Sequence, residues 1–230
     1  MLYLLHGAFG APADWDGLRG RLPAELACEA ANLWEEPAGL DLNGWGAAFA
    51  ARVAETGDPA PVLVGYSLGG RLALHALASQ PGLWKGAVLI STHPGLENEA
   101  ERAARRARDA RWREQFAALP WSAFLEAWNA LPVFGGAARP EPLPGRHAAM
   151  SRALEGWSLG AMGTEAARAA GRVNGPVLLV TGGRDPKFTE LAEDWTRRVP
   201  GLRHTVIPGA GHRVPWEEPE AFARCLRAFL

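Results

Sequence analysis

A five-residue motif between an apolar run and a helical pattern constrains this chain more than any other feature. Residues 65–69 read G-Y-S-L-G; they follow the apolar run Pro61–Val64 and precede a helix-like stretch over 70–77. A strand, a G-x-S-x-G turn and a helix are the context of a nucleophile elbow. The glycines allow a sharp turn, because a side chain at either position would collide with neighbouring backbone. The pattern predicts that Ser67 is a nucleophile at a helix N-terminus; the alternative is a serine that only caps the helix.

Composition limits the class of protein. The chain has 230 residues, enough for one large α/β domain with a sizeable core. Its formal net charge is -1, so we expect neither a nucleic-acid partner nor binding to an anionic membrane. Cys28 and Cys225 lie far apart in the sequence, as is typical of free thiols in a reducing cytoplasm. We find no signal peptide and no apolar run of membrane-spanning length, and expect a cytoplasmic monomer or small homo-oligomer.

Short apolar runs alternate with helical patterns along most of the chain. We expect strands near 2–5, 29–33, 62–65, 87–91, 177–181 and 204–207, and helices near 12–22, 43–56, 68–79, 187–199 and 217–229. This alternation predicts an α/β fold with a mostly parallel, doubly wound sheet. In such sheets the functional groups gather at the carboxyl ends of the strands.

One long segment, residues 96–170, breaks this alternation. It contains no convincing strand; a long Ala/Arg/Trp-rich helix runs to Pro120, and a Pro/Gly-rich stretch lies at 132–145. We expect a helical lid inserted over the strand ends, where it would gate and shape a pocket. Residues 1–95 and 171–230 would then form the core.

Two later strands supply partners for the serine, which needs a base that is itself oriented by an acid. The run 177–181 leads into a glycine turn and Asp185, and the run 204–207 leads into a glycine turn and His212. Taken singly, the acid could be a turn former and the histidine a surface loop residue. The order Ser67, Asp185, His212 is that of the α/β-hydrolase fold, and it predicts a catalytic triad.

A second glycine loop follows the first expected strand, where residues 4–10 read L-L-H-G-A-F-G. We assign two oxyanion donors, the backbone amides of Ala8 and Leu68, because paired N–H groups are the usual stabiliser of a nascent oxyanion. No spacing of histidines, cysteines or carboxylates suggests a metal site, and no G-x-G-x-x-G follows a strand. We therefore expect neither a metal nor another cofactor.

Cations gather where the pocket is expected. Arg71 lies one helical turn after Ser67, and the expected lid helix carries Arg102, Arg105, Arg106, Arg108, Arg111 and Arg113. These arginines could form a solvated face paired with Glu97, Glu99, Glu101 and Asp109. Alternatively, some of them grip carboxylates bidentately. With the aromatic residues of the lid, they favour a small anionic substrate that is partly apolar.

In these motifs the chain resembles a family with the α/β-hydrolase fold, the 2-succinyl-6-hydroxy-2,4-cyclohexadiene-1-carboxylate synthases of menaquinone biosynthesis. The resemblance covers most of the chain. The elbow itself is generic, and the other matching segments are much more particular. The resemblance rests on residues 65–71, on His93–Leu96 with the arginine-rich helix through Trp112, on Trp128 with Pro132–Phe134, and on residues 183–188.

The resemblance implies a lyase rather than a hydrolase. The substrate would be 2-succinyl-5-enolpyruvyl-6-hydroxy-3-cyclohexene-1-carboxylate, from which the enzyme removes a ring proton and eliminates pyruvate. Ser67 would act as the base, activated by His212 and held by Asp185. By motif position, the substrate contacts would come from Tyr66, Arg71, Arg105 and Trp128.

A further lid arginine would complete the carboxylate clamp. We assign it to Arg146, with Arg139 or Arg152 as alternatives. The chain departs from the family at its start, which lies almost at the first core strand, so that we expect a shortened N-terminal sheet edge. Two other functions stay open: a serine carboxylesterase or C–C bond hydrolase with the same triad, and a non-catalytic binding protein of the same fold.

Overall fold

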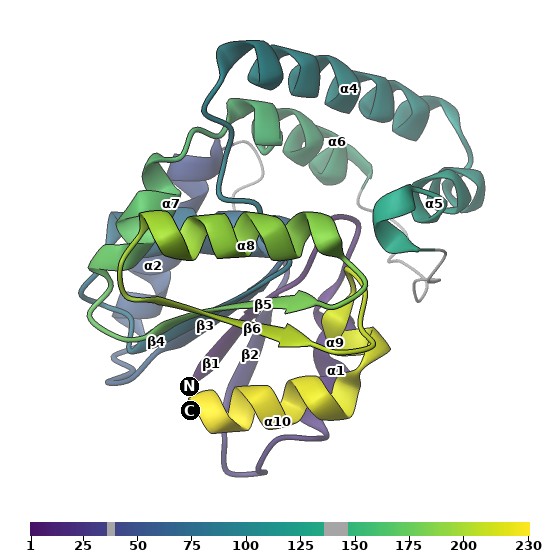
Figure 1. Cartoon of the computed structure of the whole chain (residues 1–230). Coiled ribbons are helices and arrows are strands. Elements are labelled where there is room, and N and C mark those ends of the chain that lie inside the picture. The colour runs from purple at the N-terminus through teal and green to yellow at the C-terminus, as the bar shows by residue number, and fades with distance from the viewer. Residues whose placement is uncertain (36–39, 136–146) are drawn as a thin grey trace.

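A six-stranded sheet forms the centre of the protein (Figure 1). The structure, a computed structural model, describes residues 1–35, 40–135 and 147–230. The strand order is β2-β1-β3-β4-β5-β6, and every neighbouring pair is parallel. The strands are β1 (Leu2–Leu5), β2 (Cys28–Ala31), β3 (Val62–Tyr66), β4 (Gly86–Ile90), β5 (Val177–Gly182) and β6 (Leu202–Ile207). The predicted parallel α/β sheet is confirmed.

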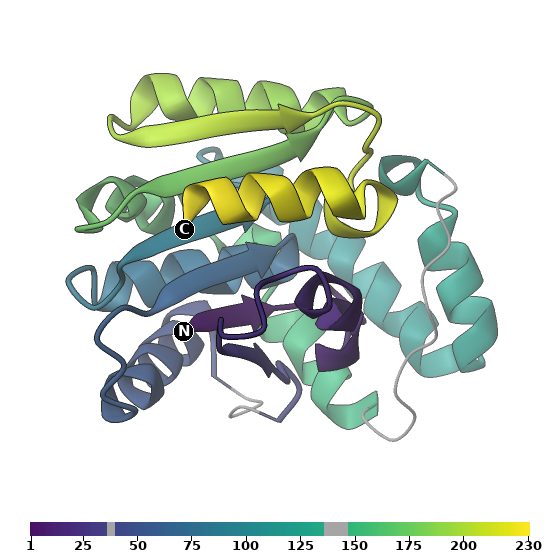
Figure 2. The ribbon, with the colours of Figure 1, turned by 90° about the horizontal axis from the view of Figure 1, so that it is seen from below.

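Helices cover both faces of the sheet (Figures 1 and 2). One face carries α1 (Asp16–Arg19), α9 (Val214–Glu217) and α10 (Pro219–Phe229). The other carries α2 (Leu42–Glu55), α3 (Leu68–Ser79), α7 (Glu165–Ala169) and α8 (Pro186–Arg198). The sheet is therefore doubly wound, as predicted.

Alternate side chains of each strand enter two separate apolar cores. In β1, Tyr3 and Leu5 pack on the side of α2 and α3, whereas Leu2 and Leu4 pack on the side of α1 and α10. Successive strand residues point to opposite faces, and a parallel sheet is buried on both. This explains why the inner strands β1, β3, β4 and β5 read as continuous apolar runs, whereas the edge strands β2 and β6 are only partly buried and contain polar residues.

Two predicted helices differ from the observed ones. The expected helix over 12–22 is a 3-10 turn at Pro12–Trp15 followed by the single turn α1, in a segment where Gly17 and Gly20 disfavour a longer helix. The expected helix over 217–229 begins at Pro219 instead. Proline has no N–H to continue the preceding turn, so α9 and α10 are separate helices.

The segment between β4 and β5 is helical, and its described residues contain no strand. It comprises α4 (Glu99–Ala118), α5 (Trp121–Asn129), α6 (His147–Gly156) and α7. In Figure 2, α4 and α5 lie beyond the arrowheads of the strands, at the carboxyl end of the sheet. Helix α7 instead packs against α3. We call residues 96–170 the insertion.

Candidate active site

Ser67 occupies a strained turn between β3 and α3. Its backbone has φ 52° and ψ −106°, a conformation that non-glycine residues rarely adopt. Its amide donates to the carbonyl of Ile90 at 2.9 Å, which anchors the turn to β4. A Cβ at Gly65 would lie 2.7 Å from the carbonyl oxygen of Gly69, and one at Gly69 would overlap the carbonyl of Leu5. Both glycines are needed for this close approach, as predicted.

Ser67, His212 and Asp185 are brought into contact. Nδ1 of His212 is 2.7 Å from Oδ2 of Asp185, and its Nε2 is 3.3 Å from Oγ of Ser67. The histidine and the aspartate are only 3% and 5% exposed, so their interaction is shielded from water. The arrangement can pass the serine proton to the imidazole and stabilise the imidazolium that results.

Aromatic rings surround the imidazole of His212. The ring centroids of Phe188, Tyr66 and Phe134 lie 4.5, 5.6 and 5.7 Å from it. Tyr66, predicted to contact substrate, also packs against Trp216 at 4.7 Å. These rings restrict rotation of the imidazole, so its two nitrogens stay directed toward the serine and the acid.

Glu217 holds the loop that carries His212. Its carboxylate accepts hydrogen bonds from the amides of Gly211 and Arg213, on either side of the histidine, at 2.8 and 2.9 Å. The same carboxylate pairs at 2.8 Å with Arg184, the residue before Asp185. Sequence reasoning missed this residue. The available signal is an acidic residue that ends the helical turn after the glycine–histidine loop.

The loop after β1 is shaped by Phe9. A hydrogen bond of 3.0 Å from the amide of Gly10 to the carbonyl of Gly7 closes the turn, and Phe9 has a positive φ of 56°. Its ring is 1% exposed and lies 4.8 Å from those of both Phe124 and Trp128 in α5. The insertion thus fixes the loop that presents the backbone next to the serine.

A small cavity collects most of the predicted substrate and oxyanion residues. It has a volume of about 40 Å³, and Ala8, Leu68, Arg71, Arg105 and Trp128 line it together. Leu68 is the first residue of α3, and the first N–H groups of a helix have no acceptor within the helix. The cavity therefore combines potential anion donors from the backbone with two guanidinium groups.

The two arginines reach the cavity from different elements. Arg71 extends from α3 and donates through Nη1 to the carbonyl of Trp157 at 2.7 Å. Arg105 extends from α4 and donates through Nε to Oδ1 of Asp109 at 2.7 Å. Burial, followed by the proximity of Arg105, lowers the pKa of Arg71 to about 9, so the group stays charged at neutral pH. Two cations therefore face one cavity.

The other paired arginines of α4 form ion pairs on the protein surface, which was the alternative to a role in substrate binding. Arg102 and Arg106 both bind Glu99, at 2.8 and 2.6 Å, and Arg113 binds Glu155 at 2.9 Å. Glu99 and Glu155 are well exposed, so these are solvated surface pairs of little energetic weight.

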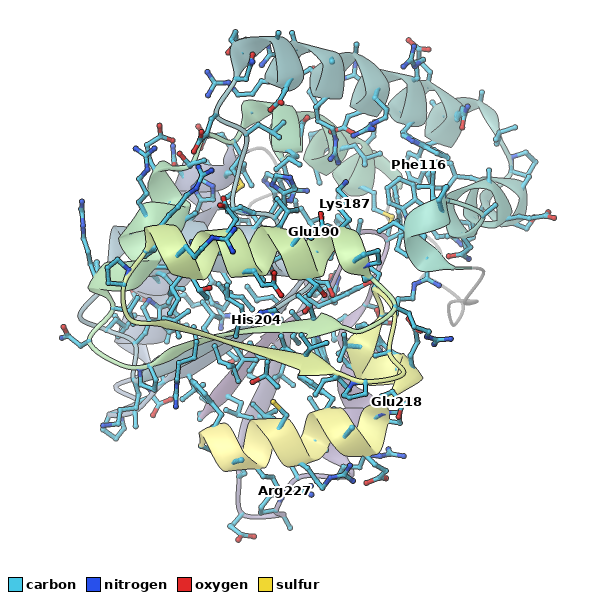
Figure 3. All side chains as sticks on the ribbon, viewed as in Figure 1. Phe116, Lys187, Glu190, His204, Glu218 and Arg227 are labelled. Carbon is cyan, nitrogen blue, oxygen red and sulfur yellow. The ribbon has the colours of Figure 1, made fainter. Side chains whose placement is uncertain are left out.

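Arg105 also lines a second, larger cavity of about 770 Å³, which we call the α4–α8 groove. Leu96 and Trp195 contribute apolar walls, and Lys187 and Arg108 contribute cations. Lys187 projects from α8 toward the insertion (Figure 3). Burial, then Arg105 and Arg108, lower the pKa of Lys187. In the described part of the chain, neither Lys187 nor Arg108 forms an ion pair.

The predicted third arginine is not placed. Arg146 and its alternative Arg139 lie outside the described residues. The other alternative, Arg152, is exposed on α6.

Across residues 1–35, 40–135 and 147–230, no three His, Cys, Asp or Glu side chains gather in a way that could hold a metal ion. No described helix has both the length and the apolar character needed to cross a membrane.

Comparisons with known proteins give a consistent result. Residues 2–225 match the model of the Alpha/beta hydrolase family. The 2-succinyl-6-hydroxy-2,4-cyclohexadiene-1-carboxylate synthase of Enterobacter sp. (strain 638) is 34% identical over 100% of this chain and 91% of that protein. The enzyme of the same name from Serratia proteamaculans (strain 568) is 32% identical over 100% and 92%. The solved structure of MenH from S. aureus has a TM-score of 0.88 and 22% identity, and covers 100% of this chain and 92% of that one.

Proposed function

This chain belongs to the Alpha/beta hydrolase family and, within it, to the 2-succinyl-6-hydroxy-2,4-cyclohexadiene-1-carboxylate synthases, and from that premise we propose its reaction. It eliminates pyruvate from 2-succinyl-5-enolpyruvyl-6-hydroxy-3-cyclohexene-1-carboxylate in menaquinone biosynthesis. The product is 2-succinyl-6-hydroxy-2,4-cyclohexadiene-1-carboxylate. Ser67, His212 and Asp185 are its catalytic triad.

One observation carries this proposal beyond the family: Arg71 and Arg105 line the same cavity as Ala8 and Leu68. An ester hydrolase has no need of two cations beside its oxyanion donors. A substrate with several carboxylates does need them, because guanidinium groups bind carboxylates through paired hydrogen bonds.

Ser67 acts as the base in this mechanism. His212 takes the Oγ proton, Oγ takes the ring proton beside the succinyl ketone, and Asp185 stabilises the imidazolium. The electron pair that is freed moves through the ring double bond and expels the enolpyruvyl oxygen from the ring. The imidazolium of His212 gives up its proton, the departing enolate takes up a proton at carbon and becomes pyruvate, and the triad returns to its starting state.

The amides of Ala8 and Leu68 stabilise the developing charge. As the ring proton leaves, negative charge accumulates on the ketone oxygen beside that carbon. Two backbone donors fixed before the reaction stabilise such a charge without having to reorganise. Tyr66 and Trp128 shape the pocket around the reacting ring.

The α4–α8 groove accommodates the part of the substrate that the small cavity cannot. Ligand sites usually measure about 300–1,000 Å³, far more than the cavity beside Leu68. Arg105 borders both spaces, so a substrate carboxylate held there can leave the rest of an acidic arm in the groove. Lys187 would meet that arm.

The insertion serves as the lid of this site, with residues 1–95 and 171–230 as the core. Helices α4 and α5 stand at the carboxyl end of the sheet, which supports this division (Figure 2). Cys28 and Cys225 are both free, which supports a cytoplasmic setting. We expect a monomer or small homo-oligomer, to be determined by light scattering after size exclusion.

The deciding experiment compares two reactions. Pyruvate release from the enolpyruvyl cyclohexene substrate is measured beside hydrolysis of p-nitrophenyl acetate, with Ser67→Ala as the control. Fast pyruvate release that depends on Ser67, with feeble ester cleavage, supports the lyase.

Two other outcomes would overturn it. Efficient ester cleavage without pyruvate release would identify a carboxylesterase or C–C bond hydrolase that uses the same triad. No turnover of either substrate, and no labelling of Ser67 by a fluorophosphonate, would favour a binding protein.

A further inference from the structure

A carboxylate lies in the cavity that is proposed to receive carboxylates. Asp109 follows Arg105 by one turn of α4 and lines the same cavity. Its Oδ1 accepts a hydrogen bond from Nε of Arg105 at 2.7 Å, and its Oδ2 accepts one from Oγ of Ser158 at 2.7 Å. By charge alone, Asp109 repels an anionic substrate, so its presence there calls for another explanation.

The way Asp109 binds Arg105 leaves much of the guanidinium available. Asp109 is the only hydrogen-bonding or ion-pairing partner of Arg105 in the described part of the chain, and it engages the Nε edge. A guanidinium carries five N–H donors in a fixed plane. Binding at Nε therefore sets the orientation of the plane while donors remain for a ligand.

Ser158 in turn fixes Asp109. Ser158 is 6% exposed, and its hydroxyl also accepts a hydrogen bond from the amide of Gly160 at 3.0 Å. Gly160 packs tightly on α4, since a Cβ there would lie 2.5 Å from the carbonyl oxygen of Arg102. Arg106 donates to the carbonyl of Gly160 at 2.7 Å. The hydroxyl thus belongs to a rigid contact between α4 and the chain after α6.

The same short segment also holds the other cation. Arg71 donates to the carbonyl of Trp157, the residue before Ser158. Two adjacent residues therefore hold both guanidinium groups. Trp157 binds Arg71 directly, and Ser158 holds Arg105 through Asp109. The segment sets the separation of two cations that come from different parts of the fold.

We propose that Asp109, anchored by Ser158, is a positioning residue that orients Arg105 toward a substrate carboxylate. This inference rests on the proposed lyase function. The substrate specificity of the enzyme would then depend on the relative placement of Arg71 and Arg105, which line one cavity and could each hold a carboxylate of the same molecule.

The positioning role and simple electrostatics predict opposite changes in substrate affinity for Asp109→Ala. Removing a negative charge should strengthen anion binding, whereas releasing Arg105 should weaken it. We expect KM for the enolpyruvyl substrate to rise about tenfold and kcat to change less than about threefold. Asp109→Asn keeps an acceptor without the charge and should restore KM to within about threefold of wild type. Ser158→Ala should raise KM about threefold without any change of charge.

A double-mutant cycle isolates the action through Arg105. In an Arg105→Ala background, Asp109→Ala should change kcat/KM by less than about twofold, because the residue it positions is gone. The matched control is Glu99→Ala, which breaks exposed ion pairs on the same helix and should leave KM unchanged. A lowered or unchanged KM in Asp109→Ala, or multiplicative effects in the cycle, overturns the proposal.

A binding measurement separates this inference from the reaction itself. Succinate, a simple dicarboxylate, is titrated into the same variants and its Kd is measured by calorimetry. If wild type binds succinate through Arg105 but releases no pyruvate, the lyase proposal fails. The double-mutant cycle of Asp109 and Arg105 is then calculated from the Kd values for succinate instead of from kcat/KM. If Asp109→Ala then binds succinate as tightly as wild type or more tightly, the positioning role fails as well.

Discussion

Ser67, the proposed base, has an unfavourable backbone conformation. A non-glycine residue at φ 52° and ψ −106° costs of the order of 1–3 kcal/mol, which the surrounding turn must offset. Ser67→Ala and Ser67→Gly both remove the hydroxyl and should both lose pyruvate release by several orders of magnitude. The glycine variant should be more stable than the alanine variant by about 1 kcal/mol, because glycine adopts this conformation freely. Urea unfolding of the two variants tests this, and equal midpoints would show that the backbone is unstrained.

Asp185 also serves two purposes. One oxygen binds His212, and the other accepts the amide of Phe188 at 3.3 Å and so caps α8. Asp185→Asn keeps a capping side chain but loses the charge that stabilises the imidazolium. A loss of about 10⁴-fold in kcat is typical of this change in Ser-His-Asp enzymes.

Stability should separate the two roles of Asp185. We expect the melting temperature of Asp185→Asn to stay near that of wild type. Asp185→Ala should unfold more easily by about 1 kcal/mol, because it also loses the cap. Pyruvate release and thermal unfolding measure the two effects, and unchanged activity in Asp185→Asn would remove this residue from the triad.

At the scale of elements, Glu217 ties together two loops that follow neighbouring strands. It contacts Arg184 after β5 and both neighbours of His212 after β6. Glu217→Ala leaves two buried or half-buried amides without their acceptor, at a cost of about 1–3 kcal/mol each if water does not replace it. We expect kcat to fall at least about tenfold, because the histidine loop loses its support.

The neighbouring residue provides a matched control. Glu218 forms no side-chain hydrogen bond or ion pair within the described chain, so Glu218→Ala should retain nearly full kcat and stability. Pyruvate release and urea unfolding of both variants are compared. Equal behaviour of the two would show that the histidine loop does not depend on Glu217.

Local patterns were sufficient to predict the elements but not all of their limits. Apolar runs bounded by glycine turns identify the strands, because burial on both faces leaves little alternative composition. The expected helix over 12–22 is shortened by Gly17 and Gly20, and the start of α10 is set by Pro219. Such breaks can be recognised in the sequence when helix propensity is given more weight than hydrophobic periodicity.

The whole molecule should lose stability in mild acid. Burial, and then the nearby Arg71, lower the pKa of His75 to about 4, and burial chiefly lowers that of His93 to about 3. In the unfolded chain the pKa of both histidines is about 6.5. Between that value and the folded pKa the unfolded state binds more protons, so stability decreases as pH falls.

The size of this effect can be measured directly. Each of the two histidines contributes at most about 1.4 kcal/mol per pH unit within the window. Urea unfolding at about pH 7, 6 and 5 should give a steep decline in the free energy of unfolding, and His75→Gln should reduce the slope. The same slope in that variant would mean that His75 does not titrate with folding.

The site could be predicted only as far as its residues are marked by local sequence. Ser67, Asp185 and His212 each follow a strand and a glycine turn that are visible in the local sequence, whereas Arg105 is distinguished from the other arginines of α4 only by the resemblance to the family. The proposed role of Asp109 could not be found in this way, because it depends on a hydrogen bond from Ser158, which lies 49 residues away in the sequence. Sequence spacing on α4 alone predicts a surface ion pair, and only the packing of the chain after α6 turns that pair into part of the cavity.

Phe9 couples helix α5 to the loop that follows β1. Its left-handed backbone is offset by burial of its ring between residues of α5, while the preceding residue, Ala8, lines the site. The position of α5 and the shape of this loop therefore depend on each other. A grafted cover that lacked rings at positions 124 and 128 would release Phe9, and an engineer would see turnover fall although every residue of the triad had been kept.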